Sequence, residues 1–449
     1  MFHPLPREIV DHIFDYLHGD ISSLAASSLV CRFWLPTTRT HLFRTLTCKP
    51  LRPSASVPAL NLWLSHCPDV APYVHELRIH EDPAAAVYTF DEAVGQDDLE
   101  ALMRLLPNLK DVHISQVIFR PFPPGASPPV PSNKPLRRLT MDGCDSFHPA
   151  DEVPGIYGVF SLFSAIEVLR ICDTWLSQAS IDVVSAYWTR LQSRLHVQNL
   201  SVESQFCMVH PAVRQLLRYV LHVPSLRGLW LDFGDVAESA APNTVLGDPR
   251  LQLRDLGINT SRLALHESAR RQELPPAPRW RIPALGAAKT IERITLRFAP
   301  DSDGMLSRLG DDVIGRNTDI LRSAPPSVQE VVLHFPRVPI NGIVREDAVR
   351  LVLHHPRWLD GREFDDALVA LPGLRTVTVL VDHDDGGVGG REPLVFSWIS
   401  PLPDGTVIKR AAASEGREYM ASLEKALPRS RSKVDIKLML ICVDDAGLW

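Results

Sequence analysis

The chain has 449 residues, of which 45% are hydrophobic and 22% are charged, a balance typical of globular proteins. Its net charge of -6 predicts no general attraction to nucleic acid. The sequence contains no run of about 18 apolar residues, and no basic segment followed by an apolar one opens it. We therefore expect neither a membrane span nor a signal peptide.

The seven cysteines lie far apart, and none forms a C-x-x-C pair. This spacing favours reduced thiols in a cytoplasmic or nuclear protein over a framework of disulfides. The closely spaced ligand pairs of a structural zinc site are missing as well. We expect no metal and no cofactor.

The first predicted element is a helix over residues 5–17. Ile9, Ile13 and Leu17 recur every four residues, which places them on one wide apolar stripe. Pro6 is tolerated there, because the N–H groups of a first turn have no partner within the helix.

Two more short helices are predicted before residue 45. The second covers residues 21–30, with Leu24 and Leu29 as its anchors. The third starts or bends at Pro36 and ends near Phe43. Three helices of this length enclose only a small core, so several apolar residues are left over.

Surplus apolar surface on a small helical module is typical of a docking face. The alternative is that the three helices cap the domain that follows them. The surplus residues are Leu5, Pro6, Ile9, Ile13, Val30, Cys31 and Trp34.

The order of apolar anchors in this segment resembles that of an F-box. The residues of the segment are also similar to the F-boxes of fungal, mushroom-type proteins. It starts with L-P-x-E-I, continues with L-V-C-x-x-W and closes with R-x-x-L-F. The resemblance implies a three-helix F-box over residues 1–50. It also implies that the seven surplus residues bind the adaptor subunit of SCF ubiquitin ligases. The matching anchors are Leu5, Pro6, Glu8, Ile9, Ile13, Leu17, Asp20, Leu24, Leu29, Val30, Cys31, Trp34, Arg39, Leu42 and Phe43.

The remaining residues repeat one short pattern, apolar-x-x-apolar-x-apolar, which predicts a strand at each occurrence. Consecutive copies start 27 to 46 residues apart. A further strand is predicted over residues 433–443, where the alternation persists without the full pattern. The copies cover residues 74–79, 109–114, 136–141, 166–171, 197–202, 226–231, 253–258, 291–296, 328–333 and 374–379.

Helical segments precede several of these strands, at 98–109, 180–195, 211–226 and 366–374. Such a unit buries its apolar face only by stacking on its neighbours, which favours a solenoid with parallel strands. The pattern resembles irregular leucine-rich repeats. We therefore predict an α/β fold in which residues 51–449 form about 10–11 units. A non-repeating α/β domain with buried parallel strands is the alternative.

The strand alternation also predicts which side chains face outward on the concave side of such a solenoid. Arginine and tryptophan are enriched at interface hot spots, so we expect this face to bind an acidic or phosphorylated protein segment. Ordinary solvated positions are the alternative, and Trp230 could equally pack under a loop. The outward residues are Arg78, His113, Arg138, Arg170, Trp230, Arg293, Arg297 and His334.

No phosphate-binding loop, nucleophile elbow or metalloprotease motif occurs in the sequence. We therefore expect a substrate receptor of an SCF-type cullin ubiquitin ligase that is not itself an enzyme. Its partners would be the adaptor, the cullin complex and a protein substrate, without nucleic acid or membrane. Two alternatives stay open: a scaffold that binds the adaptor outside a cullin complex, and an enzyme with an unrecognised site.

Overall fold

The computed structural model divides the chain into two compact units, Met1–Glu203 with Pro211–Ser225 and Ser204–His210 with Leu226–Trp449. Each unit is described by itself below. The structure describes residues 6–17, 20–50, 52, 55–80, 94–121, 135–145, 155–174, 187–189, 194–203, 216–232, 246–260, 283–298, 306–335, 339–340, 343–344, 362–383, 425 and 427–442.

The first unit opens with the three predicted helices, α1 (Arg7–Asp15), α2 (Ile21–Ser28) and α3 (Leu35–Phe43). Their shared core is as small as expected. It consists of three buried side chains, with Leu17, Trp34 and Leu42 packed against them. The buried residues are Val10, Phe14 and Leu24.

Local capping fixes where the helices begin. The Asp20 carboxylate accepts a hydrogen bond of 3.0 Å from the Ser23 N–H and thereby caps α2. Hydrogen bonds from the Ser23 side chain and backbone lower the pKa of Asp20 to about 2. Pro36 lies in the first turn of α3, where no backbone donor is lost. The predicted role of Leu29 is wrong: it follows α2 and is 86% exposed.

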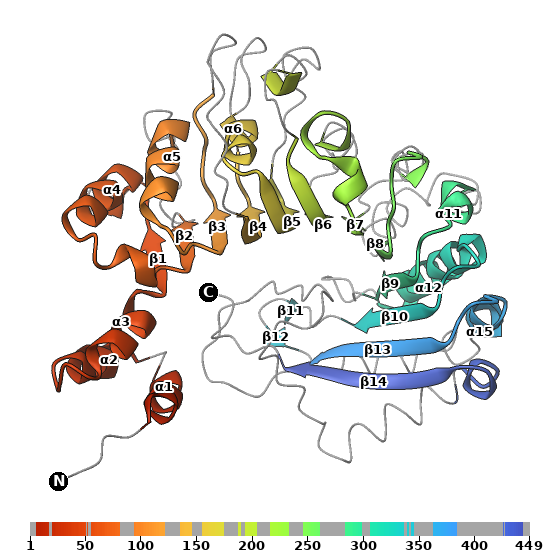
Figure 1. Cartoon of the computed structure of the whole chain (residues 1–449). Coiled ribbons are helices and arrows are strands. Elements are labelled where there is room, and N and C mark those ends of the chain that lie inside the picture. Colours follow the sequence, from red (N-terminus) through yellow and green to blue (C-terminus); the bar gives the residue numbers. More distant parts are fainter. Residues whose placement is uncertain are drawn as a thin grey trace. The chain divides into compact units, whose positions relative to one another are not determined.

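The rest of the first unit alternates helix and strand (Figure 1). Its strands are β1 (Thr45–Cys48), β2 (Glu76–His80), β3 (Asp111–Ser115), β4 (Leu136–Asp142), β5 (Ala165–Cys172) and β6 (His196–Glu203), each parallel to the next. Figure 1 shows α4 (Val57–His66), α5 (Gln96–Leu105) and α6 (Gly155–Ser161) along one side of these strands. Short turns complete it: η2 (Ala71–Tyr73), the π-helix η5 (Leu216–Val220) and η6 (Val223–Ser225).

The second unit contains six parallel strands, β7 (Gly228–Asp232), β8 (Asp255–Asn259), β9 (Arg293–Arg297), β10 (Glu330–Phe335), β13 (Thr376–His383) and β14 (Asp435–Cys442). An antiparallel pair, β11 (Pro339–Ile340) and β12 (Ile343–Val344), is separate. The helical elements are α11 (Pro283–Ala287), α12 (Leu306–Ser323), α15 (Arg362–Val369) and η8 (Ser430–Ser432).

Among the described residues, six parallel strands thus follow one another in chain order within each unit. All ten copies of the repeated pattern form strands, as does the predicted last strand. The sequence analysis missed β1, which directly follows the three helices and pairs with β2. The α/β fold with repeated helix–strand units is confirmed. The segments 120–135, 273–284 and 382–393, whose proline or glycine content predicts loops, lie almost wholly outside the described residues. The domain boundary at residue 50 and the number of units stay predictions.

Three consecutive strands of the first unit end in the same way. Gln116, Gly143 and Asp173 follow β3, β4 and β5, and all three have a positive φ. Each donates its N–H to the carbonyl of the last residue in the next strand, over 2.8, 2.9 and 2.8 Å. A Cβ at Gly143 would lie 2.0 Å from Nε2 of Gln116, so glycine suits this position. Repetition of one strained backbone conformation at one register indicates a true structural repeat.

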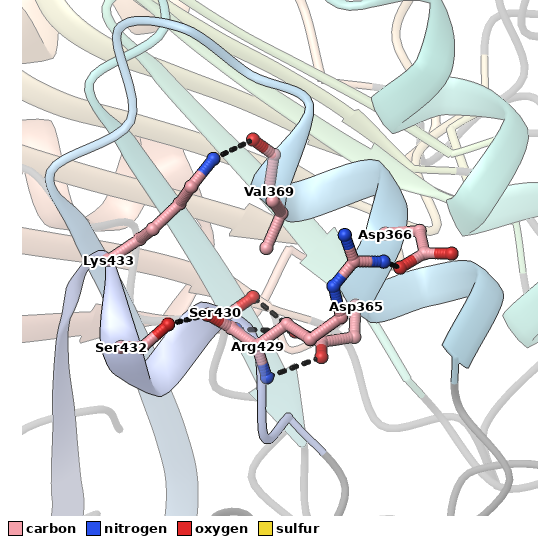
Figure 2. Close-up of polar contacts among 7 residues, drawn as sticks. All are labelled: Asp365, Asp366, Val369, Arg429, Ser430, Ser432 and Lys433. Carbon is pink, nitrogen blue, oxygen red and sulfur yellow. Dashed lines mark hydrogen bonds and ion pairs between the residues drawn. The ribbon is translucent and has the colours of Figure 1, made fainter.

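A buried carboxylate ties the last strand of the second unit to α15 (Figure 2). Asp365 is 1% exposed, and its two carboxylate oxygens accept 2.8 Å hydrogen bonds from the N–H groups of Arg429 and Ser430. The Ser430 hydroxyl donates a third bond. The neighbouring Asp366 instead forms an exposed ion pair with the Arg429 guanidinium. Asp365 therefore fixes the turn that leads into β14.

Replacing Asp365 with alanine should loosen this turn, because three donors, two of them buried on Ser430, would lose their shared carboxylate acceptor. We expect a loss of about 2–4 kcal/mol in the free energy of unfolding of this region. Asp366→Ala is the matched control and should cost at most about 1 kcal/mol, since its ion pair is solvated. Hydrogen exchange of residues 427–434 and urea unfolding would measure both. Equal protection in the two variants would contradict the proposed role.

Candidate functional site

The N-terminal module exposes a large part of its apolar surface. Ile9 and Ile13 are each 47% exposed on α1, and Val30 is 63% exposed after α2. Pro6 and Cys31 are exposed as well, while Leu5 lies outside the described residues. An exposed apolar group of this size on a small module is typical of a docking surface. We call it the apolar face of the module.

Trp34 differs from the other predicted docking residues. It is only partly exposed, because its ring packs edge-to-face against the buried Phe14, with centroids 5.6 Å apart and planes at 80°. It therefore belongs partly to the core of the module. Its place in a docking surface stays a prediction.

The structure adds residues to the apolar face that the sequence analysis did not select. Tyr16, the C-cap of α1, continues the stripe of Ile9 and Ile13 because it lies three residues beyond Ile13 in a helical backbone conformation. The three-residue spacing from Ile13 is visible in the sequence and could have identified Tyr16 as part of this surface. Among the described residues of the module, the exposed large apolar side chains are Ile9, Ile13, Tyr16, Ile21, Leu29, Val30 and Phe33.

A second surface of interest lies on the strands of the first unit. Side chains alternate between two sides of these strands: in β2, Leu77 and Ile79 are buried, whereas Glu76, Arg78 and His80 are partly exposed. We call the side opposite the buried apolar residues the polar face of the first unit. Three predicted arginines lie on it, with their register neighbours on adjacent strands. They are Arg78, Arg138 and Arg170.

Two of these arginines are paired with acids. The Arg78 Nε lies 2.6 Å from Oε1 of Glu76, and the Arg170 Nε lies 3.2 Å from Oε1 of Glu203. The side chains of Arg170 and Glu203 are 15% and 7% exposed, so their charges are largely shielded from water. On the polar face, ion pairs therefore hold Arg78 and Arg170 in fixed positions, unlike charged side chains that move freely at a surface.

His113 lies at the centre of this pattern, opposite Arg78 on the neighbouring strand. Burial lowers its pKa to about 4, and the positive charges of Arg78, Arg170 and then His80 and Arg138 add to the effect. The imidazole is consequently neutral at pH 7. On the same face, burial raises the pKa of Asp142, although the charge of Arg170 opposes this.

In the second unit, the predicted binding residues are placed differently. Arg293 is partly exposed between two acids, with Nη1 3.3 Å from Asp255 Oδ1 and Nε 2.7 Å from Glu330 Oε2. Trp230, Arg297 and His334 are only 7%, 6% and 4% exposed. The expectation that these three face solvent is therefore wrong. Strands β8, β9 and β10 are buried on both sides from their second residue onward.

Trp230 owes its burial to a neighbour without a side chain. A Cβ at Gly257, its register partner on β8, would lie 1.7 Å from Cε3 of the indole. The ring thus lies directly over the Gly257 backbone. Trp230 acts here as a core residue, as the alternative in the sequence analysis allowed.

Other kinds of site are not found in the described part of the chain. No group of three or more His, Cys, Asp or Glu residues there could hold a metal ion. None of its helices is long and apolar enough to cross a membrane. Five described cysteines, Cys31, Cys48, Cys67, Cys144 and Cys172, are free thiols.

Comparison with protein-family models gives one match: residues 2–49 match the F-box-like family. The match covers the three helices and the apolar face. No curated protein matches the chain. The chain therefore contains an F-box-like domain at its N-terminal end.

The lowered pKa of His113 makes a prediction about stability. Its folded-state pKa of about 4 lies below the ordinary 6.5, so between these values the unfolded state binds more protons. Stability should be full above pH 6.5 and fall as the pH drops toward 4. His113→Gln removes this contribution. Between pH 7.5 and 5, the free energy of unfolding of this variant should fall by about 1–2 kcal/mol less than that of wild type.

Urea unfolding at the two pH values would measure this difference. His12→Gln, at an exposed position of α1, is the control and should behave as wild type. An identical pH response of His113→Gln and wild type would show that the imidazole is not held neutral.

Proposed function

We propose that this chain is a substrate receptor of an SCF-type cullin ubiquitin ligase. The observation that carries the proposal is the F-box-like domain at residues 2–49 together with the exposed apolar face on its helices. F-box domains bind the adaptor subunit of such ligases. The docking residues we propose are Leu5, Pro6, Ile9, Ile13, Val30, Cys31 and Trp34.

In this proposal the helix–strand repeats hold the protein substrate. The polar face of the first unit supports this role, because it presents partly exposed arginines at fixed register positions. Arg293 offers a further contact in the second unit. We keep residues 51–449 as the substrate region and propose that it is related to irregular leucine-rich repeats. We also propose that the F-box is of the fungal, mushroom-type kind suggested by its sequence.

The chemical step would belong to other subunits. The chain would bring a substrate lysine close to the ubiquitin-transfer machinery, and the gain in rate would come from proximity. We propose no catalytic residue in this chain and no cofactor.

A scaffold that binds the adaptor without a cullin is the second candidate. The same apolar face would serve it, so the two functions differ only in what co-purifies. Recovery of cullin with the adaptor would exclude the scaffold function, and recovery of adaptor alone would favour it.

Charge placed on the apolar face should abolish adaptor binding. The double change Ile9→Asp and Ile13→Asp puts two carboxylates where apolar contacts would form, and we expect at least a hundredfold loss of affinity. Both side chains are already half exposed, so the module should stay folded. Co-elution with the adaptor and calorimetry would measure the effect.

Leu62→Asp is the matched control, since Leu62 is 63% exposed on α4 outside the F-box-like domain. It should bind the adaptor as wild type does. If the double variant binds the adaptor as tightly as wild type, or if wild type does not bind it, the proposed function is contradicted.

A further inference from the structure

Two histidines of the first unit lie against each other where β6 begins. The ring centroids of His196 and His222 are 4.3 Å apart, and the ring planes are tilted by 32°. His196 is the first residue of β6 and is exposed, whereas His222 follows η5 and is partly buried. Two imidazoles this close are a pair of metal-binding groups that the proposed receptor function does not use.

Backbone pairing holds the two histidines side by side. Leu195 and Leu221 form an isolated parallel bridge. The Leu195 N–H donates to the Val220 carbonyl over 3.0 Å, and the His222 N–H donates to the Leu195 carbonyl over 2.8 Å. Each histidine directly follows one of the bridged leucines, so the two side chains leave the backbone on the same side.

The segment that leads to His222 has an uncommon backbone. η5 is a π-helix, a form that is rare and is found frequently at functional sites. The Leu221 N–H continues its wide turn by donating to the Leu216 carbonyl over 2.9 Å, five residues back. This turn sets the position of the bridge at Leu221 and, with it, the position of His222.

One nitrogen of the pair lacks the partner that a buried polar atom needs. Nδ1 of His222 is buried and has no hydrogen-bond partner among the described residues. Such an atom is costly to fold away, and a bound ion is one of the things that explains it. Burial lowers the pKa of His222, and the charges of His196 and Arg194 lower it further. The imidazole is therefore neutral at pH 7 and keeps a lone pair for a metal ion.

The separation of the rings suits two ligands of one ion. Because metal–nitrogen bonds to imidazole are about 2.0–2.1 Å long, two rings on one ion have centroids about 4.5–5.2 Å apart, for angles of about 90–109° at the ion. The observed 4.3 Å is only slightly shorter. His196 is exposed, so a small rotation of its side chain brings the pair into this range.

We propose that His196 and His222 bind a divalent transition-metal ion such as Zn²⁺, with one nitrogen from each ring and water at the remaining positions. Imidazole suits Zn²⁺, whereas Mg²⁺ and Ca²⁺ prefer oxygen ligands. The ion would tie the start of β6 to the chain after η5 and takes no part in catalysis. The inference goes beyond the proposed receptor function and does not depend on it.

The charges near the pair determine how binding depends on pH. Besides His196, the charge that acts on His222 is that of Arg194, and this side chain is exposed and stays hydrated. An ion needs both imidazoles deprotonated, so protons compete with it. We therefore expect the affinity for Zn²⁺ to fall at least about tenfold between pH 7.5 and 5.5.

Calorimetric titration of the full chain with Zn²⁺ at pH 7.5 tests the site. We expect wild type to bind Zn²⁺ and not Mg²⁺. His196→Gln and His222→Gln should each weaken the binding of Zn²⁺ at least about tenfold, because each keeps only one of the two ligands. His66→Gln is the matched control, since His66 is exposed on α4, and it should bind Zn²⁺ as wild type does.

Hydrogen exchange separates this site from zinc bound elsewhere, for example at the exposed thiol of Cys31. Zn²⁺ should slow the exchange of the Leu195 and His222 amides in wild type, because an ion that binds only the closed pair opposes local opening. His196→Gln should lose this protection, and thermal unfolding checks that this variant at an exposed position is folded.

Three results would overturn the proposal. The first is a wild-type chain that does not bind Zn²⁺ at pH 7.5. The second is binding within twofold of wild type in both folded variants, which would place the zinc elsewhere. The third is zinc binding that leaves the exchange of the Leu195 and His222 amides unchanged. Adaptor binding is measured separately, so a failure of the receptor function leaves the zinc site standing, and the reverse holds as well.

Discussion

Pairing of parallel strands is the constraint on which the structure depends. In each unit, successive strands exchange backbone hydrogen bonds with the next strand in the chain, and the residue before several strands accepts two N–H groups at once, as His75 does from Lys110 and Asp111. No single helix–strand unit could bury its apolar side alone, so stability comes from neighbouring units. The same pairing holds the side chains of adjacent strands in fixed register, which is why Arg78, His113 and Arg138 face one another although they lie 35 and 25 residues apart in the sequence.

The F-box-like module differs from the repeats in how much of its apolar surface is buried. Its core is only Val10, Phe14 and Leu24 with a few partly buried neighbours, so most of its apolar residues stay at the surface. This exposed apolar surface is the basis of the proposed adaptor binding. The two halves of the proposed function thus rest on two kinds of surface: an apolar one on helices, suited to permanent assembly, and a charged one on strands, suited to recognition.

The two units treat their strands differently. On β2 and β3 of the first unit the polar side chains are partly exposed, whereas β9 and β10 of the second unit are buried on both sides. Arg297 and His334 are therefore interior residues, and Trp230 fills the space above Gly257. Substrate contacts are consequently better sought on the polar face of the first unit and at Arg293.

Apart from β1 and the short pair β11 and β12, the sequence alone was sufficient to place the strands. It also placed the helices of the F-box-like module, because apolar periodicity and capping residues act over a few neighbouring positions. It was also sufficient to assign one side of each strand to the core. It could not show that Trp34 packs on Phe14, that Leu29 is exposed or that Trp230 is buried, since each depends on a residue brought near by folding. For the same reason, the partial burial of Arg138 and the lowered pKa of His113 emerge only when neighbouring strands are aligned. Register between distant segments, and the burial it creates, is a property of the assembled fold.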